Sequence, residues 1–206
     1  MGGLETLLAD PDILKLQTAL SLQAGRGSED EDGVRRAAVA LIFRNGEAGE
    51  GSKSPELLFI KRADYPGDPW SGQVAFPGGR EEPGDLSLAD TAARETREET
   101  GIDLMRDGTF LGTLDDLRPR INRLPDVIVR PYVVLLDRYE PLVLSSEVAL
   151  AFWIPLEALK TADSWRETPL LARGVQINTR AFHHEGHIVW GMTERVLGQL
   201  LAILAA

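Results

Sequence analysis

The chain has 206 residues, of which 43% are hydrophobic, and this is enough to build one globular domain with a sizeable core. It contains no cysteine, so disulfides, thiol nucleophiles and thiolate metal sites are excluded. The formal net charge of −10 argues against broad binding to nucleic acid or to anionic membranes, so we expect neither as a partner.

The first 33 residues are predicted to form an arm separate from a main domain of residues 34–206. Residues 4–22 space Leu and Ile at helical intervals around Pro11, which predicts one broken helix or two short amphipathic helices. Residues 24–33 are rich in Gly and acids, which is typical of a mobile linker. The arm could pack on the main domain or on a second subunit, which would make a homodimer. No signal-peptide pattern and no apolar run of roughly 18 residues occurs, so we expect a cytoplasmic protein.

Two apolar runs, residues 36–43 and 56–61, have the length of buried strands. The polar segment 45–55 between them predicts a hairpin with a long loop. Arg62 stands where the second strand ends, and it could either reach a substrate phosphate or be a surface cation.

A loop rich in proline and glycine follows at residues 64–71 and carries Tyr65 and Trp70. These aromatic side chains could stack on a nucleobase or anchor the loop to the core. The next turn, Phe76–Gly79, ends in two glycines, which let the backbone approach a ligand or a metal closely.

The stretch of residues 78–102 carries the strongest chemical signal of the chain. Its second half places Glu95, Glu98 and Glu99 within five residues. A helix advances about 100° per residue, so Glu98 and Glu99 lie about 60° and 40° to either side of Glu95. Like charges so close are unfavourable on a bare helix, so the three carboxylates need a compensating cation. Hard oxygen ligands of this kind suit Mg²⁺ or Mn²⁺.

The boundaries of this helix can be predicted. Ser87 is a plausible N-cap with Asp90 three residues later, and Gly101 fits the position that ends a helix. A face of small residues would let the helix lie close to a sheet; it consists of Ala89, Ala92, Ala93 and Thr96. The alternative is a solvated, charge-rich helix after a turn, which the glycine turn and the Arg94–Glu95 pair disfavour.

Residues 109–114 are predicted to form a strand, and the loop of residues 115–126 follows it. This loop is the most basic short segment of an acidic chain because it carries Arg118, Arg120 and Arg123. Arginine forks suit phosphates, so the loop could hold substrate at the rim of a pocket. It could equally be a flexible surface loop with solvated charges.

Residues 126–136 predict a strong strand in which Pro131 indicates an edge or a bulge. Glu147 precedes another strand, residues 151–156, and is a candidate fourth carboxylate that acts as metal ligand or base. The alternative is an acidic residue at the start of a short helix. A short helix is expected to begin near Pro155.

The last part of the chain is predicted to contain strands near residues 175–179 and 187–189 and a final helix that opens at residues 190–193. The apolar face of that helix consists of Val196, Leu197, Leu200, Leu201 and Leu204. Three histidines could suggest a metal trio, but no carboxylate stands nearby at ligand spacing, so we interpret them as hairpin residues. They are His183, His184 and His187.

The acidic helix resembles the signature of the Nudix hydrolases, G-x5-E-x7-R-E-U-x-E-E-x-G-U, in which U is aliphatic. The match is complete at six positions: Arg94, Glu95, Glu98, Glu99, Gly101 and Ile102. Two positions depart from it, because Thr96 replaces the aliphatic residue and Gly79 stands one residue further from Arg94. Asp85 then takes the place of the first Glu, approximately.

The longer spacing and the run of residues 72–79 resemble the coenzyme A pyrophosphatase branch of this family. That branch has an upstream motif similar to L-L-T-x-R-S/A-x3-R-x3-G-x3-F-P-G-G. This chain offers residues 58–63 and then Gly72, but it lacks the second Arg and carries one extra residue. A W-G-x-T opening of the terminal helix is also similar, so the resemblance runs from about Val39 to Leu201.

The resemblance implies an α/β/α sandwich with a mixed sheet. It carries metal ligation onto Glu95, Glu98 and Glu99, with the Gly79 carbonyl as a backbone ligand and Arg94 orienting the carboxylates. Glu147 or a helix glutamate would be the base. The residues expected to contact substrate are Arg62, Arg80, Arg118, Arg120, Arg123 and Phe76.

The implied reaction is hydrolysis of a diphosphate bond in a nucleoside diphosphate derivative, with Mg²⁺ or Mn²⁺ as cofactor. Coenzyme A or an acyl derivative, cut to 3′,5′-ADP and a phosphopantetheine, is the leading substrate. ADP-ribose, another nucleoside diphosphate sugar or a nucleoside triphosphate is the alternative. A non-catalytic module that binds a nucleotide is the alternative of another class.

Overall fold

The computed structural model describes residues 3–23, 25–28, 33–46, 54–65, 70–119, 126–138, 141–172 and 174–206. Its main sheet has seven strands in the order β3-β2-β1-β6-β5, with β4 also paired to β1 and β7 also paired to β2. The strands are β1 (Arg35–Asn45), β2 (Pro55–Arg62), β3 (Val74–Ala75), β4 (Gly78–Arg80), β5 (Gly108–Thr113), β6 (Val127–Leu136) and β7 (Val148–Pro155). The β1–β6 pair is parallel and the other pairs are antiparallel, so the predicted mixed sheet is confirmed.

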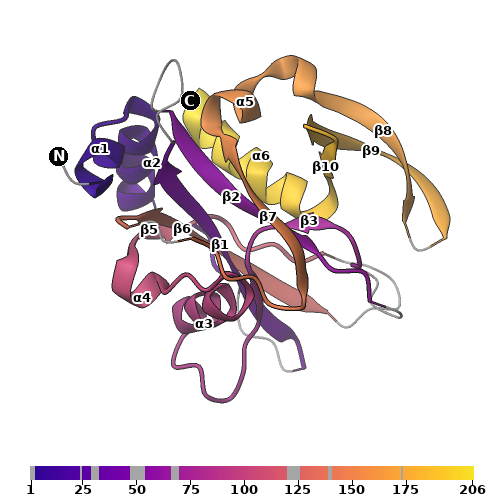
Figure 1. The fold of residues 1–206 in the computed structure, drawn as a ribbon, viewed down its shortest axis with the longest axis horizontal. Helices are drawn as coiled ribbons and strands as arrows, with labels where there is room; N and C mark the ends of the chain where they lie inside the picture. Colours follow the sequence, from indigo (N-terminus) through magenta and orange to yellow (C-terminus); the bar gives the residue numbers. More distant parts are fainter. Residues whose placement is uncertain are drawn as a thin grey trace.

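Helices cover both faces of this sheet, and a small second sheet lies beside it (Figure 1). The helices are α1 (Gly3–Leu8), α2 (Pro11–Leu22), α3 (Leu88–Thr100), α4 (Leu104–Asp107), α5 (Leu156–Lys160) and α6 (Gly191–Ala205), with a 3-10 turn at Ala162–Ser164. The second sheet has the order β10-β9-β8 and consists of β8 (Trp165–Ala172), β9 (Val175–His184) and β10 (His187–Val189). Within the described ranges no helix is long and apolar enough to cross a membrane.

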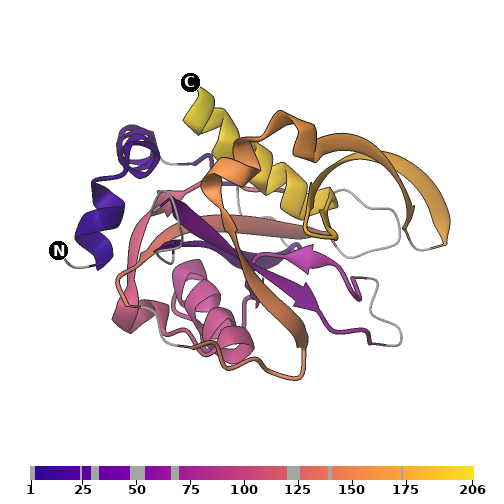
Figure 2. The ribbon, with the colours of Figure 1, turned by 45° about the horizontal axis from the view of Figure 1, so that its top comes forward.

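The alternation of side chains along β1 builds a core on each face of the sheet. Leu41 and Phe43 belong to the larger apolar cluster, under α6 and α2, whereas Ala40 and Ile42 belong to a smaller cluster under α3. Figure 2 shows α3 and α6 on opposite sides of the main sheet. The architecture is therefore the predicted α/β/α sandwich.

The N-terminal arm forms two helices, as predicted, and the Asp10 carboxylate caps α2 through the backbone N–H of Asp12 (3.0 Å). Helix α2 packs on α6 and β5 of the same chain. Residues 25–28 of the predicted linker contact the main domain, because Asp115 and Asp116 accept hydrogen bonds from this segment, at 2.8 Å from the Arg26 N–H and 2.7 Å from the Ser28 N–H. The arm thus packs on its own domain.

The predicted edge position of Pro131 is wrong, because β6 lies inside the sheet between β1 and β5. The β5–β6 register shifts between Phe110 and Gly112, and the Pro131 carbonyl accepts from the Leu114 N–H at 3.0 Å. A residue's N–H and C=O point to the same side of a strand, so the missing N–H of Pro131 faces Leu114, one residue past the end of β5, where the ladder has stopped.

The strands β1 and β2 diverge, and the turn before α3 fills the gap. They pair with each other only at Phe43–Asn45, while further along β4 pairs with β1 and β3 pairs with β2. The Ala40 N–H donates to the Pro77 carbonyl at 2.8 Å. A Cβ at Gly78, whose φ is 146°, would overlap the backbone of Ala38, so only glycine fits there. This gap holds the turn against α3.

Candidate active site

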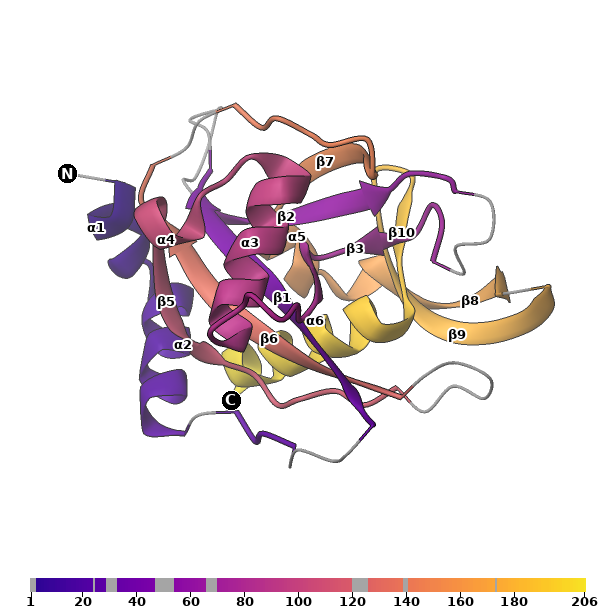
Figure 3. The ribbon, with the colours of Figure 1, turned by 90° about the horizontal axis from the view of Figure 1, so that it is seen from below.

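The local sequence fixes both ends of α3, as predicted. The Ser87 hydroxyl accepts from the Asp90 N–H (3.2 Å) and donates to the Asp90 carboxylate (2.7 Å), and Gly101 ends the helix with φ 79°. Ala92 and Thr96 are fully buried on the face that meets the sheet. The small side chains bring the helix close to the strands (Figure 3). The helix therefore lies near enough for its glutamates to reach the glycine turn.

Arg94 is the centre of an ion-pair network. Its Nε and Nη2 donate to the two carboxylate oxygens of Asp85 at 2.9 and 3.0 Å, and its Nη1 reaches Glu95 at 3.1 Å and Glu98 at 3.4 Å. Nη2 also donates to the Arg80 carbonyl at 2.9 Å. Asp85 is nearly buried, and the Arg94 guanidinium holds the pKa of its carboxyl well below the usual range. The structure thus gives Asp85 a defined partner at the position where the signature has Glu.

Glu99 is 4% exposed, and its carboxylate accepts a hydrogen bond from the Gly78 N–H at 2.9 Å. Burial raises the pKa of Glu99 to about 7, and the nearby charges of Glu95 and Glu147 act in the same direction. The Gly78 hydrogen bond and the charge of Arg62 oppose this rise. A buried carboxylate in this condition would be stabilised as an anion by a cation.

Glu95 lies directly over Gly79, because a Cβ at Gly79 would overlap its carboxyl group. Partial burial raises the pKa of Glu95, and Arg94 offsets part of this rise. Any larger residue at 79 would displace the carboxylate from the turn. The two glycines thus act differently. The Gly78 N–H donates to the Glu99 carboxylate, and Gly79, which has no side chain, leaves room for the Glu95 carboxylate beside the backbone.

Glu98 differs from its neighbours, since its side chain is 60% exposed. Among the residues that the structure describes, no three His, Asp or Glu side chains converge closely enough to hold a metal by themselves. Mg²⁺ usually takes one or two carboxylates and completes its coordination with water and substrate phosphates. Glu95, Glu99 and the backbone of Gly79 fit that donor set.

Two further predicted residues reach this site from strand ends. The Ala63 N–H donates to the Glu147 carbonyl at 2.8 Å, and Arg62 pairs in register with Val148. Both Arg62 and Glu147 act electrostatically on Glu99. The pairing of β2 with β7 therefore brings Glu147, 48 positions from Glu99 in the sequence, to the same place.

Comparison with known proteins identifies the family of the domain. The NUDIX domain model matches residues 34–173. The chain belongs to the Nudix hydrolase family. It is 34% identical over 170 residues to NudL of Photorhabdus laumondii, an uncharacterised Nudix hydrolase, covering 82% of this chain and 84% of NudL. An uncharacterised protein of Schizosaccharomyces pombe is 36% identical over 140 residues, which are 61% of this chain and 43% of that protein.

The fold of a solved Nudix structure is also similar. A Caenorhabditis elegans Ap4A hydrolase in a binary complex superposes with a TM-score of 0.54 at 21% identity, covering 84% of this chain and 98% of that one. At this identity the likeness supports the Nudix fold alone. The mixed sheet with helices on both faces is therefore the Nudix fold, and we call α3, which carries the segment that resembles the family signature, the Nudix helix.

The residues predicted to contact substrate differ in their exposure and in their partners. Arg80 is exposed on the turn that carries Gly79, whereas Arg118 pairs with Asp126 at 2.9 Å. Phe76 is 3% exposed and packs on Phe59 with ring centroids 4.9 Å apart, so its ring offers a substrate no surface. The prediction that Phe76 contacts substrate is wrong, because the residue anchors the turn in the core. Arg120 and Arg123 lie outside the described residues.

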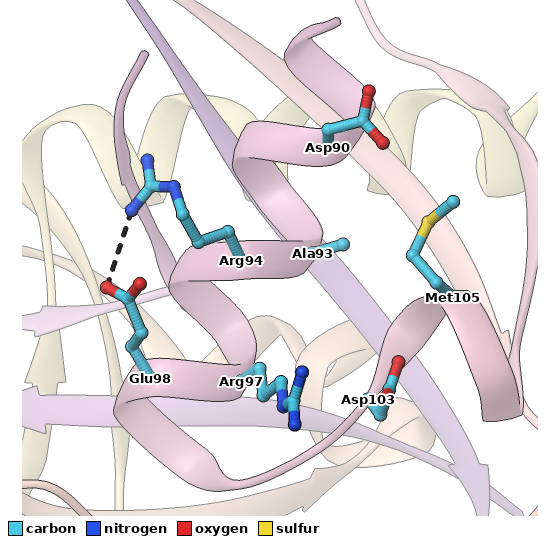
Figure 4. Close-up of a pocket in the computed structure, with 7 residues that line it drawn as sticks. All are labelled: Asp90, Ala93, Arg94, Arg97, Glu98, Asp103 and Met105. Atoms are coloured by element: carbon cyan, nitrogen blue, oxygen red, sulfur yellow. Dashed lines mark hydrogen bonds and ion pairs between the residues drawn. The ribbon is translucent and has the colours of Figure 1, made fainter. Parts of the chain in front are cut away.

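Figure 4 shows a hollow beside α3, and neither Glu95 nor Glu99 is among the residues that line it. It shares Arg94 and Glu98 with the site described above, and the rest of its wall comes from residues with no predicted catalytic or binding role. These are Asp90, Ala93, Arg97, Asp103 and Met105. We therefore place the candidate site at the glycine turn.

The histidines are hairpin residues, as predicted. His183 lies on β9 with one ring nitrogen 2.7 Å from the Thr168 hydroxyl and the other 2.9 Å from Arg166. His187 opens β10 and stacks on Phe152. The residue that sequence reasoning overlooked is Gly78, whose N–H holds Glu99; the signal available for it was the doubled glycine.

Proposed function

We propose that the chain hydrolyses the diphosphate bond of a nucleoside diphosphate derivative with the help of Mg²⁺ or Mn²⁺. The observation that carries this proposal is the buried Glu99 carboxylate, tied to the Gly78 N–H and close to the charges of Glu95 and Glu147. A buried carboxylate near two other acidic groups is costly unless a cation neutralises them, and such a cation can in turn bind a phosphate.

The metal would be held by Glu95, Glu99 and the Gly79 carbonyl, with Glu98 as a further ligand at the exposed rim. When bound, such an ion polarises the phosphoryl oxygens and lowers the pKa of water. The protein's own part is to orient the ligands. Arg94 fixes Glu95 and Glu98 through ion pairs, and Asp85 in turn fixes Arg94.

The base that accepts a proton from the attacking water would be Glu147 or one of the helix glutamates. Glu147 is exposed to solvent at the start of β7, so it can exchange protons with water. Glu99 has a pKa raised to about 7, which suits proton transfer at neutral pH. The pH–rate profile of Glu147→Gln distinguishes them. A base must be deprotonated to act, so loss of the fall in rate at low pH assigns the role to Glu147, and an unchanged profile assigns it to the helix.

Coenzyme A or an acyl-CoA, cut to 3′,5′-ADP and (acyl-)phosphopantetheine, is our first choice of substrate. Its support is the partial upstream motif that ends at Gly79, with Arg62 as the matching arginine. ADP-ribose, another nucleoside diphosphate sugar or a nucleoside triphosphate is the second choice. Arg62, Arg80 and Arg118 would hold the phosphates, and so would Arg120 and Arg123.

The decisive experiment measures turnover of coenzyme A, ADP-ribose and dinucleoside polyphosphates with Mg²⁺ or Mn²⁺, with the products identified by mass. Cleavage within a diphosphate, abolished by EDTA, is expected. Glu99→Gln is expected to lower kcat by at least about 100-fold while the fold is retained. Full activity of Glu99→Gln would refute the assigned site.

A non-catalytic nucleotide-binding module is the second candidate function. A pure binder has no need to keep three repelling carboxylates next to one another. It would bind these nucleotides, and their masses would be unchanged after long incubation with either metal. This result would favour binding over hydrolysis as the function.

A further inference from the structure

A row of aromatic rings runs over the α6 face of the sheet from the glycine turn to the surface. Phe76, next to the turn, packs on Phe59, whose ring centroid lies 6.1 Å from that of Phe152. His187 stacks on Phe152 with centroids 4.2 Å apart and an angle of 16° between the rings. Phe59 is fully buried, whereas Phe152 and His187 are both partly exposed, so the row ends at solvent.

His187 is unlike the histidine next to it on the hairpin. Both ring nitrogens of His183 have polar partners within the second sheet. For His187 the described part of the chain contains no such hydrogen bond. Its imidazole is instead held flat by Phe152, which leaves a planar face and two polar ring atoms available for a ligand.

The position of His187 suits the part of a nucleotide that extends beyond its diphosphate. Strand β10 packs on β3 (Figure 1), and β3 pairs with Ile60 and Lys61, immediately before Arg62. Phe59 stands three residues before Arg62, which is about 10 Å along a strand. Because β2 ends at Arg62, a ligand with its diphosphate there can pass around the strand end to the α6 face.

We infer that His187, supported by Phe152, forms the wall of the substrate pocket on which the planar base of the nucleotide stacks. This rests on the proposed function, because it assumes a nucleotide with its diphosphate at Glu95 and Glu99. Every base has a π-face, so such a wall favours nucleotides over other diphosphates without selecting one base by hydrogen bonds. The pair His187–Phe152 thus determines substrate class, while the Nudix helix performs the reaction.

The test uses two ligands that differ by the nucleoside. Calorimetry with Mg²⁺ measures the Kd of the methylene-bridged analogue of ADP, which resists hydrolysis, and of methylenediphosphonate, which lacks ribose and base. His187→Ala is expected to weaken the ADP analogue by about 5- to 150-fold, the range that stacking of one base supplies. Methylenediphosphonate is expected to bind as it does to the wild type.

His187→Phe separates stacking from hydrogen bonding, because it keeps a flat ring and removes both nitrogens. It is expected to restore most of the affinity for the ADP analogue. His184→Ala is the matched control, since this histidine lies on the same hairpin and its ring packs towards Phe182. Circular dichroism melts of each variant check that the hairpin is folded.

Three results would overturn the inference. The first is an unchanged affinity of His187→Ala for the ADP analogue. The second is an equal loss for both ligands, which would mean that the imidazole contacts phosphate or supports the fold. The third is wild-type protein that binds the ADP analogue no more tightly than methylenediphosphonate. None of these three results excludes metal-dependent hydrolysis. A failure of the proposed function is recognised separately, by the absence of turnover on the substrate panel.

Discussion

The two faces of the main sheet are covered in different ways. Under α6 the core is made of large side chains such as Phe43, Leu197 and Leu200, and all three are completely buried. Under α3 the apolar cluster is smaller, Ala accounts for four of its eleven buried residues, and Thr96 and Glu99 are buried beside it. The α6 face therefore supplies most of the hydrophobic stabilisation, while the α3 face gives up apolar area to hold charged groups close to the backbone.

Leu197→Ala tests the part of this comparison that concerns stability. The side chain is fully buried on α6, so its removal is expected to lower the free energy of unfolding by about 2–5 kcal/mol. Urea unfolding measures the loss. The kcat of the folded fraction is expected to match the wild type, because Leu197 lies on the opposite face from Glu95. Leu201→Ala, at a half-buried position of the same helix, is the control and should cost less. A kcat that falls with stability in both variants would contradict a division between the faces.

Glu99 tests the cost of placing a carboxyl group in the core. Its pKa is raised to about 7 in the folded state, against about 4.3 in the unfolded chain, so the native state binds more protons between these values. Stability of the metal-free protein is therefore expected to fall by about 3 kcal/mol as the pH rises through this window. Urea unfolding in EDTA at pH 4.5 and 8 measures the fall.

Glu99→Gln removes the titrating group, so the difference in stability between wild type and variant should depend on pH in the same way. At pH 8, Mg²⁺ is expected to recover part of the lost stability in the wild type and less in Glu99→Gln. Identical pH dependence in the two proteins would mean that Glu99 is not the group responsible.

The sequence contained most of the information on the α3 face. The caps of the helix and its small-residue side follow from local spacing, and both are confirmed by the contacts of Ser87 and Gly101 and by the burial of Ala92 and Thr96. Asp85 was assigned through the family resemblance, and it forms an ion pair with Arg94. The depth of each carboxylate could not be predicted in this way. Glu98 and Glu99 are neighbours on the helix, yet of the two only Glu99 reaches the turn. The burial of each carboxylate depends on where the diverging strands β1 and β2 place Gly78.

The sequence was less informative on the other face. Strand β8 was not predicted, because Pro169 interrupts it and its residues do not alternate clearly; it forms as the edge of a hairpin, where proline is tolerated. Phe152 and His187 stand 35 positions apart and have no shared motif. Their stacking arises only from the packing of β10 near β7, a tertiary contact that no local pattern encodes.

Asp85→Asn sharpens the account of the ion-pair network. The change keeps the size of the side chain but removes the charge that two guanidinium nitrogens of Arg94 contact. Unfolding free energy at pH 7 is expected to fall by about 2 kcal/mol, with a loss of kcat of about 10-fold because Arg94 orients Glu95. The pKa of Asp85 is lowered in the fold, so its contribution is present above the unfolded pKa near 3.9 and disappears in stronger acid.

The measurement for Asp85 is urea unfolding of both proteins from pH 7 down to pH 2.5, with the gap between them closing as the pH falls. Asp85→Glu is the matched control, since it keeps the charge and has the residue of the family signature. A constant gap at all pH values would show that Asn disturbs the loop for a reason other than the lost ion pair.

Thr96→Val is expected to have the smallest effect and the opposite sign. Thr96 stands where the Nudix signature has an aliphatic residue; it is completely buried, and its hydroxyl has no hydrogen-bond partner among the described residues. Valine has the same shape without the hydroxyl, so the variant is expected to be more stable by about 1 kcal/mol. Thr100→Val is the matched control one turn later: this hydroxyl donates to the Thr96 carbonyl at 2.7 Å, and its loss should destabilise by a similar amount. Thermal melts of both variants measure the two changes. A lower Tm in both variants would mean that a buried water or another group already forms a hydrogen bond with the Thr96 hydroxyl. The departure from the signature at Thr96 would then not destabilise the α3 face.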